Sequence, residues 1–366
     1  MNDKTKHIVQ TVIFLLILFS LAFVCWTKPA DAYSESERRE LAQMPEISYD
    51  SLTSGKFMSE FEEYTLDQFP ERDLFRRIKA YTSTYVLRQK DNNNLYVSDG
   101  YIAKVEYPMN KDSIAYASKK FNDIYEKYLK ETGSKVYFAV IPDKNAFLAD
   151  ESGHLKMDYD LFYEQMMEEN DYGVHIPIHE LLSKEDYYLT DTHWKQEMIT
   201  DVAEEIAFQM GAVIKNDYNV VKLDVPFYGV YYGQSALPLD ADKLCYLEND
   251  IINSLVVYDH QNGRNIAVYE MDKVQGKDPY EMFLGGPLSL VTIENPMAET
   301  DKELIVFRDS FGSSMAPLLA QGYRKVTLVD IRYISSTILE SYIDFNGEDV
   351  LFLYSTQVLN NSNTIK

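Results

Sequence analysis

Hydrophobic residues fill the chain from residue 8 to residue 26, where Gln10, Thr11 and Ser20 are the clearly polar members and no residue is charged. A helix rises about 1.5 Å per residue, so a helix over this segment nearly crosses a hydrocarbon core about 30 Å thick. The pattern therefore predicts an N-terminal transmembrane helix.

Basic residues flank this apolar segment on both sides. Lys4 and Lys6 precede it, which favours a cytoplasmic N-terminus, and Lys28 follows it. The alternative is a removed signal peptide with Ala30-Asp31-Ala32 as its cleavage site. The segment is longer than the apolar core of a usual signal peptide, so we favour an uncleaved single-pass anchor in the cell membrane. In both cases the rest of the chain is expected to be extracytoplasmic.

Apolar positions at helical spacing continue beyond the anchor within a charged and polar segment. Phe57 and Phe61 belong to one such pattern, which stops at Pro70. We interpret residues 1–27 as the cytoplasmic tip and membrane anchor, and residues 28–90 as a juxtamembrane helical stalk.

From residue 91 onward, apolar runs typical of buried strands alternate with amphipathic helical patterns. The apolar runs that we expect to form strands are 136–141, 304–307, 326–329 and 350–353. This alternation predicts an α/β domain with a mostly parallel sheet covered by helices on both faces. Functional sites in such folds lie at the carboxyl ends of the strands.

Local signals place smaller elements around this sheet. Asp99-Gly100 predicts the turn of a hairpin. A helical pattern over 114–128 follows Asp112 and Ser113, either of which is a candidate N-cap. A second helical pattern runs from residue 198 to residue 206.

The helical rhythm is lost between about residue 215 and residue 300. Tyr228–Gly233 and Leu284–Pro287 are rich in aromatic residues, glycine or proline, which indicates loops and short antiparallel strands. We therefore interpret residues 91–366 as one α/β domain with an inserted region at about 215–300.

Composition narrows the range of partners. The formal net charge of −23 argues against nucleic acid as a ligand. The 29 tyrosines suit carbohydrate, because a tyrosine ring stacks on the C–H face of a sugar and its hydroxyl forms hydrogen bonds. Cys25 lies in the apolar segment and Cys245 lies far from it, so the fold is expected to form without a disulfide.

Three residues have the chemistry that acyl transfer through a serine ester requires. Ser310 follows a predicted strand, and Asp191 and His193 lie two residues apart upstream. A serine hydroxyl is a poor nucleophile near neutral pH, so a histidine must take its proton while a carboxylate fixes the imidazole tautomer. The backbone N–H of Ser310 or Phe311 is a candidate donor to the oxyanion.

Each part of this pattern also has a structural interpretation. Asp191 is a candidate helix cap, and Asp309-Ser310 is a candidate cap of the next helix. His175 and His179 are four residues apart, but Pro177 lies between them and no carboxylate or cysteine stands at ligand spacing, so no metal is expected. The glycine-containing segments lack phosphate-binding patterns, so we also expect no cofactor.

The segments D-T-H-W at 191–194 and R-D-S-F at 308–311 resemble the DHHW family of exported bacterial proteins. That family is related to the alginate O-acetyltransferases of the SGNH-hydrolase superfamily. The resemblance covers most of the chain beyond the anchor. Three further segments agree with it, at 37–45, 141–144 and 280–286.

The resemblance implies an SGNH-hydrolase-like, flavodoxin-like α/β domain with a triad of Ser310, His193 and Asp191. It also implies a permuted catalytic order, because ordinary SGNH enzymes place the serine first. Two positions depart from the family pattern. Thr192 stands where the family has its first histidine, which is not a triad position, and Arg308 replaces the glycine that usually precedes Asp-Ser.

The resemblance also suggests residues that contact the substrate, because the related acetyltransferases use an arginine and a tyrosine near the acyl or sugar group. Arg332 and Tyr354 are the candidates here, since both are predicted at strand ends, and a structural role is the alternative for each. Tyr228, Tyr231 and Tyr232 are candidates for the wall of an acceptor groove, with core packing as their alternative.

Together these features predict a membrane-anchored, extracytoplasmic O-acyltransferase that modifies a cell-envelope or exported polysaccharide. Acetyl is the expected group, and it would pass through a serine acyl-enzyme. The resemblance implies a membrane-bound O-acyltransferase as the partner that supplies the acyl group. The alternatives are a carbohydrate deacetylase or esterase, and a non-catalytic carbohydrate-binding or assembly protein of the envelope.

Overall fold

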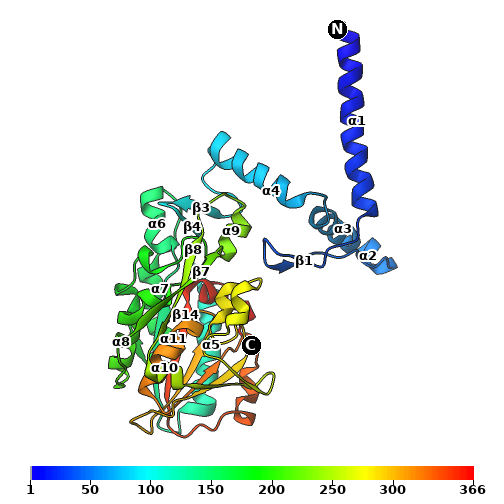
Figure 1. The fold of residues 1–366 in the computed structure, drawn as a ribbon. Helices are drawn as coiled ribbons and strands as arrows, with labels where there is room; N and C mark the ends of the chain where they lie inside the picture. The colour runs from blue at the N-terminus through cyan, green and yellow to red at the C-terminus, as the bar shows by residue number, and fades with distance from the viewer. Residues whose placement is uncertain (1) are drawn as a thin grey trace. The chain divides into compact units, whose positions relative to one another are not determined.

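The computed structural model describes residues 2–366, which divide into two compact units (Figure 1). The first unit contains the chain up to Asn92 together with Gly233–Pro238. The second unit contains Asn93–Tyr232 and Leu239–Lys366.

The first unit begins with the apolar helix α1 (Asp3–Thr27), as the hydrophobic pattern predicted. Its 25 residues are long and apolar enough to cross a membrane, and none of its side chains is buried. The later elements of this unit are β1 (Tyr33–Ser34), β2 (Arg39–Glu40), α2 (Tyr49–Thr53), α3 (Lys56–Asp67), α4 (Arg72–Tyr81) and the π-helical turn η1 (Thr82–Val86).

Ion pairs hold the short elements of the first unit together. Arg39 binds the carboxylate of Asp67 through both terminal nitrogens, at 2.8 and 2.5 Å. Arg76 donates to the carbonyl oxygen of Gly233 at 2.8 Å. This last contact explains why a segment distant in the sequence belongs to the first unit.

The second unit is built on an eight-stranded sheet with the order β10-β9-β11-β13-β12-β14-β5-β6. Five of these strands run parallel to one another. They are β5 (Lys135–Ile141), β6 (Val174–Ile176), β12 (Glu303–Arg308), β13 (Lys325–Val329) and β14 (Asp349–Ser355). The predicted α/β class with a mostly parallel sheet is confirmed.

The region from about 215 to 300 extends this sheet at one edge. Its strands β9 (Val256–Asp259), β10 (Arg264–Ile266) and β11 (Leu290–Glu294) pair antiparallel with one another, and β11 pairs antiparallel with β13. A separate antiparallel ribbon consists of β7 (Asn219–Phe227) and β8 (Asp242–Glu248). The short antiparallel strands were predicted, but their addition to the main sheet was not.

Alternating side chains along the strands build a core on each face of the sheet. On β12, Leu304 and Val306 join one buried cluster, whereas Ile305 and Phe307 join the other. Helices α8 (Thr200–Gln209) and α11 (Gly312–Leu319) supply the first cluster. Helices α5 (Lys111–Ile124), α7 (Tyr159–Glu169) and α12 (Thr356–Asn360) supply the second.

The local predictions are confirmed with two corrections. A hairpin of β3 (Leu95–Ser98) and β4 (Tyr101–Lys104) turns at Asp99-Gly100, where both residues have positive φ. The N-cap of α5 is Asn110, whose side chain accepts the backbone N–H of Ser113 at 3.1 Å. The other predicted helix begins only at Thr200, because Gln196–Met198 forms a 3-10 turn.

Phe352 on β14 offers a test of where the core lies. Its ring stacks between those of Phe138 and Phe307, with centroid distances of 5.0 and 4.8 Å. Because truncation would leave a cavity, Phe352→Ala should lower the free energy of unfolding by about 3–5 kcal/mol. Chemical denaturation of the full chain in detergent, followed by the fluorescence of the buried Trp194, measures this loss.

The matched control is Phe208 on α8, whose side chain is 75% exposed. Phe208→Ala should change the free energy of unfolding by no more than about 0.5 kcal/mol, since it opens no cavity. Equal losses in the two variants would contradict the placement of the core.

Candidate active site

Ser310, His193 and Asp191 form one hydrogen-bonded chain. His193 Nε2 lies 2.7 Å from Ser310 Oγ, and His193 Nδ1 lies 2.6 Å from Asp191 Oδ1. Both distances are short enough for direct proton transfer between the groups. The structure therefore brings together the three residues that the sequence pattern selected, in the order aspartate, histidine, serine along the chain.

The turn between β12 and α11 presents Ser310 at the carboxyl end of a central strand. The buried Asp309 fixes this turn, because its Oδ1 accepts the backbone N–H of Phe311 at 3.0 Å. Its Oδ2 accepts the backbone N–H of Ser355 at 2.8 Å, which ties the turn to the end of β14. The position of the serine thus depends on two neighbouring strands.

These contacts also separate the two predicted oxyanion donors. The N–H of Phe311 is committed to Asp309, whereas the N–H of Ser310 has no hydrogen-bond partner among residues 2–366. A free N–H beside a nucleophile is the geometry that an oxyanion needs. Of the two donors, Ser310 is the one that the structure leaves open.

Arg308 lies within β12, and its φ is not positive, so this position makes no use of the conformational freedom of glycine. Its side chain is fully buried and donates to the carbonyl oxygens of Asp309 and Leu288, both at 3.3 Å. Burial lowers the pKa of Arg308, and the carboxylate of Asp330, 3.8 Å away, opposes that shift. The departure from the family pattern therefore leaves the backbone before Ser310 unstrained.

The loop at residues 187–194, the histidine loop, carries Asp191 and His193. Asp191 is 1% exposed, and its carboxylate also accepts the backbone N–H groups of His193 at 3.0 Å and Val230 at 2.8 Å. Gly229 packs directly against it, since a Cβ there would lie 2.2 Å from the Cβ of Asp191. The aspartate is thus held by its own loop and by the start of α9 (Val230–Ser235).

A second carboxylate holds the residues just before Asp191. Asp242, at the start of β8, accepts the backbone N–H groups of Leu189 at 2.7 Å and Thr190 at 2.8 Å. It also accepts the hydroxyl of Thr190 at 2.5 Å. The sequence offered no signal for this contact, because Asp242 lies in the inserted region about 50 residues downstream.

Tyr280 fixes the plane of the imidazole ring. The rings of His193 and Tyr280 stack with a centroid distance of 3.8 Å and an angle of 8°. The hydroxyl of Tyr280 lies 2.8 Å from Ser314 Oγ, and Trp194 Nε1 donates to the same oxygen at 2.8 Å. Sequence reasoning missed this role, and the one available signal was the part that segment 280–286 plays in the family resemblance.

Lys144 lies beneath the loop and is almost completely buried. Its Nζ donates to the carbonyl oxygens of Tyr188 at 2.8 Å and Leu189 at 3.1 Å. Loss of hydration lowers the pKa of Lys144 to about 7, and the nearby carboxylates of Asp191 and Asp242 oppose the shift. The lysine therefore holds the histidine loop from below at a cost in hydration.

The preceding residue, Asp143, is also buried. Its Oδ2 accepts the hydroxyls of Thr356 and Tyr159, both at 2.8 Å. Loss of hydration and the charge of Glu106 raise the pKa of Asp143 to about 6. The segment after β5 thus links the histidine loop with the start of α12.

The remaining candidate residues differ in how they are placed. Arg332 binds Asp330 through Nε and Nη2, at 2.9 and 2.7 Å, so its guanidinium is committed to that carboxylate. Tyr354 is 1% exposed and packs against Phe121, with ring centroids 5.1 Å apart. For these two, the structure favours the structural role that the sequence had left open.

The three tyrosines of the inserted region also divide. Tyr231 is buried, and its hydroxyl donates to Thr192 Oγ1 at 3.3 Å and accepts from Gln357 Nε2 at 2.6 Å. The rings of Tyr228 and Tyr232 lie 4.5 Å apart, and Tyr228 is 42% exposed. Tyr228 and Tyr232 therefore stay candidates for a groove wall, whereas Tyr231 supports the histidine loop.

The other histidines considered in the sequence are packed against rings. His175 stacks on Phe138 at 5.0 Å, and His179 stacks on Tyr163 at 3.9 Å. Within residues 2–366, no group of three or more His, Cys, Asp or Glu residues is arranged to hold a metal ion.

Comparison with known proteins finds similarity at the level of structure. No family model and no curated protein matches the chain. A DHHW family protein from Eubacterium siraeum has a similar solved structure, with a TM-score of 0.61 and 17% identity over 75% of this chain and 95% of that chain. The chain has the fold of the DHHW family. The resemblance predicted from D-T-H-W and R-D-S-F is thereby confirmed.

Two further solved structures are similar to this chain. Bacillus cereus PatB1 with a sulfonyl adduct has a TM-score of 0.56 and 19% identity over 74% of this chain and 96% of that chain. The O-acetyltransferase domain of Pseudomonas putida AlgJ has a TM-score of 0.45 and 11% identity over 73% of this chain and 92% of that chain. At 19% identity, the similarity to PatB1 concerns the fold.

Lys144 gives the site a measurable pH signature. Its pKa is about 7 in the folded protein against an ordinary 10.5, so between these values the unfolded chain binds more protons than the folded chain. The lysine's contribution to stability should therefore rise with pH across this window, by up to about 1.4 kcal/mol per pH unit. Lys144→Met should lack this part of the slope in unfolding curves measured from pH 7 to 10.

Lys119 is exposed on α5 and serves as the control. Lys119→Met should keep the slope of the parent chain. Identical slopes in the parent chain and in Lys144→Met would show that the lysine is hydrated and does not hold the loop.

Proposed function

We propose that this protein is an O-acyltransferase that transfers an acyl group, expected to be acetyl, to a polysaccharide through an ester on Ser310. The observation that carries this proposal is the hydrogen-bonded chain of Ser310, His193 and Asp191, with links of 2.7 and 2.6 Å. It joins a nucleophile, a base and a carboxylate that orients the base.

The first half of the reaction forms the acyl-enzyme. Ser310 Oγ attacks the acyl carbon of a donor ester while His193 Nε2 takes the hydroxyl proton. Asp191 keeps the Nδ1–H of the imidazole in place and stabilises the positive charge that develops on the ring. The N–H of Ser310 donates to the oxyanion, and the protonated His193 then gives its proton to the leaving alkoxide of the donor.

The second half repeats these steps with a sugar hydroxyl. His193 takes the proton of the acceptor hydroxyl as its oxygen attacks the Ser310 ester. The collapse of the second tetrahedral intermediate releases the acylated sugar, and the proton returns from His193 to Ser310 Oγ. No group besides the donor and the acceptor is consumed.

One similar solved structure supports a reactive nucleophile. The solved structure of PatB1 contains a sulfonyl adduct. Sulfonyl groups transfer to activated nucleophilic side chains, and the contact between His193 and Ser310 would activate the serine hydroxyl in this way. The stacking of His193 on Tyr280 holds the base in line with the serine through the reaction.

Localisation follows from α1 and its flanks. We propose that α1 is an uncleaved anchor, that residues 28–90 form a stalk, and that residues 91–366 act outside the cytoplasm. A membrane-bound O-acyltransferase would then bring the acyl donor to the outer face. The mass of the chain purified from membranes distinguishes an anchor from a removed signal peptide, because cleavage would delete about 30 residues.

A carbohydrate esterase remains the second candidate, because water can replace the sugar hydroxyl in the second half of the reaction. Transfer requires an acceptor held beside the ester strongly enough to compete with water at about 55 M. The adjacent rings of Tyr228 and Tyr232 favour transfer, since paired aromatic rings suit the C–H faces of a sugar.

Ser310→Ala and His193→Ala test the chemistry. Residues that act as one unit are non-additive, so each variant should lower the hydrolysis of a chromogenic acetyl ester by about 10³-fold or more, and the double variant should lose little further. Mass spectrometry should find the acetyl group on the peptide that contains Ser310. Ser341→Ala, at an exposed serine, is the control and should keep full activity. Activity retained in Ser310→Ala would refute the proposed nucleophile.

The choice between transfer and hydrolysis is tested with an acceptor. A positioned sugar hydroxyl should divert the acyl group from water. Adding a neutral oligosaccharide to the enzyme and an acetyl donor should therefore yield acetylated sugar and suppress the release of free acetate. If the release of acetate is unchanged across a panel of envelope glycans while Ser310 still turns over, the protein is an esterase.

A further inference from the structure

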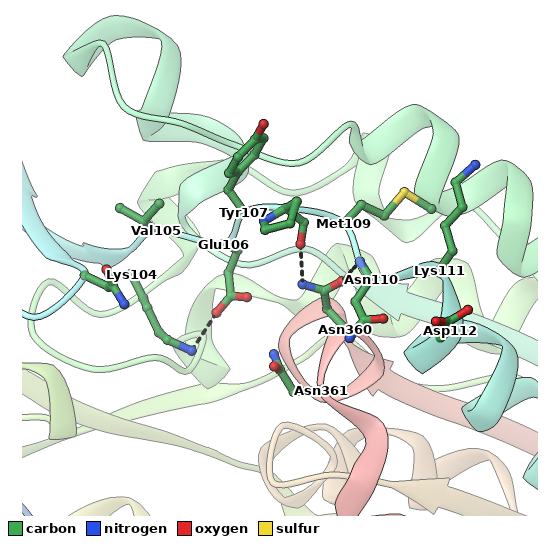
Figure 2. A pocket seen from close by; sticks show the side chains of 12 residues that line it. Lys104, Val105, Glu106, Tyr107, Met109, Asn110, Lys111, Asp112, Asn360 and Asn361 are labelled. Atoms are coloured by element: carbon green, nitrogen blue, oxygen red, sulfur yellow. Dashed lines mark hydrogen bonds and ion pairs between the residues drawn. The ribbon is translucent and has the colours of Figure 1, made fainter.

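A polar pocket of about 560 Å³ opens beside the end of β4 (Figure 2). Three segments of the second unit line it, namely Asn94, residues 104–112 and Asn360-Asn361. None of these residues belongs to the hydrogen-bonded chain of Ser310, His193 and Asp191. The pocket therefore has no role in the steps described above.

The lining of the pocket suits a hydroxyl-rich ligand. Glu106 is 3% exposed and pairs with Lys104 at 2.9 Å, so the lining contains a carboxylate paired with an ammonium group (Figure 2). The amide of Asn361 and the ring of Tyr107, which is 54% exposed, also line the pocket (Figure 2). Amide and carboxylate groups bind sugar hydroxyls, and an exposed tyrosine ring stacks on the sugar face.

Charge in the pocket is balanced. Lys104 and Lys111 are matched by Glu106 and Asp112, so the lining has no net formal charge. The chain as a whole has a net charge of −23, which disfavours the approach of a polyanion. Both observations favour a neutral ligand.

The wall of the pocket is preformed. Asn360 Oδ1 accepts the backbone N–H of Asn110 at 2.7 Å, and its Nδ2 donates to the carbonyl oxygen of Pro108 at 3.3 Å. Both ends of the amide thus hold the segment that carries Tyr107 (Figure 2). A preorganised wall spares a ligand the entropic cost of ordering it.

Helix α12 connects the pocket with the candidate active site. At its start, Gln357 Oε1 accepts the hydroxyl of Thr192, the residue between Asp191 and His193, at 3.0 Å. Just past its end, Asn361 Nδ2 donates to the carbonyl oxygen of Gln357 at 3.1 Å. One helical turn, about 5.4 Å of rise, thus separates the pocket lining from the residue that contacts the histidine loop.

We propose that this pocket binds a sugar unit of a neutral acceptor glycan, next to the unit whose hydroxyl is acylated. This inference rests on the proposed transfer to a polysaccharide and adds the location and the charge class of the acceptor. An acceptor held at a second unit is fixed in orientation, which is what favours transfer over hydrolysis.

Binding to the inactive Ser310→Ala chain tests the pocket independently of turnover. The probes are two neutral tetrasaccharides, chitotetraose and cellotetraose, and one anionic tetrasaccharide, tetramannuronate. Calorimetry should detect binding of at least one neutral probe. Tetramannuronate should bind more weakly or not at all. Adding Tyr107→Ala should raise the Kd of the neutral probe by about tenfold, since the ring contact is lost. Adding Glu106→Gln should weaken binding in the same direction.

Tyr342→Ala is the matched control, because Tyr342 is 55% exposed and lines a different pocket. It should leave the Kd unchanged. In the chain with Ser310 intact, Tyr342→Ala should also keep the hydrolysis of a small acetyl ester within about twofold, because Tyr342 is exposed and lies outside the pocket.

Several outcomes would overturn the inference. These are a Kd unaffected by both pocket substitutions, tighter binding of tetramannuronate than of the neutral probes, or no binding of either neutral probe. Failure of the proposed function is a separate result, because it would show as acetyl ester hydrolysis that persists in Ser310→Ala.

Discussion

The site depends on two buried charged residues, Lys144 and Asp242, which clamp the loop before His193 from two sides of its backbone. One bridge, between Tyr187 and Trp194, closes this loop, and regular secondary structure contributes nothing further to its shape. Lys144 holds its carbonyl oxygens and Asp242 holds its N–H groups. Buried charges are tolerated only where they are fully hydrogen-bonded. Lys144 and Asp242 lose hydration when they are buried, and the hydrogen bonds that they form in return fix the position of Asp191.

The parts of this site that the sequence predicted are the parts with local signals. An apolar run ending at Ser310 marks a strand end, and the spacing of Asp191 and His193 marks a pair that can face one side. Lys144 and Tyr280 had no such signal of their own, because their contacts join positions far apart in the sequence. The same reason explains the sheet edge formed by β9–β11, since strand pairing at long range is not encoded in any single segment.

Arg308 shows how a departure from a family pattern can be absorbed. A glycine before the Asp-Ser pair is replaced by the largest basic side chain, yet the strand continues through this position. Space comes from Gly312, where a Cβ would lie 2.7 Å from the Cβ of Arg308. Arg308 and Arg332 both pair with the buried carboxylate of Asp330, at 3.8 and 2.7 Å, and Arg308 also donates to the backbone carbonyl oxygen of Asp309. The terminal nitrogens of Arg308 find acceptors in the carbonyl oxygens of Asp309 and Leu288, so the turn keeps its geometry.

Short contacts around the end of β14 connect the nucleophile, the base and the proposed acceptor pocket. Ser355, its last residue, is bonded to Asp309 beside the serine, and Gln357 on α12 is bonded to Thr192 beside the histidine. An error in the placement of one group would therefore move the others with it. An acceptor bound at the end of α12 would be positioned by the same contacts that position Ser310 and His193. Transfer and hydrolysis differ only in whether a sugar hydroxyl or water reaches the Ser310 ester. The contacts around the end of β14 would therefore favour transfer by holding the sugar hydroxyl beside the ester.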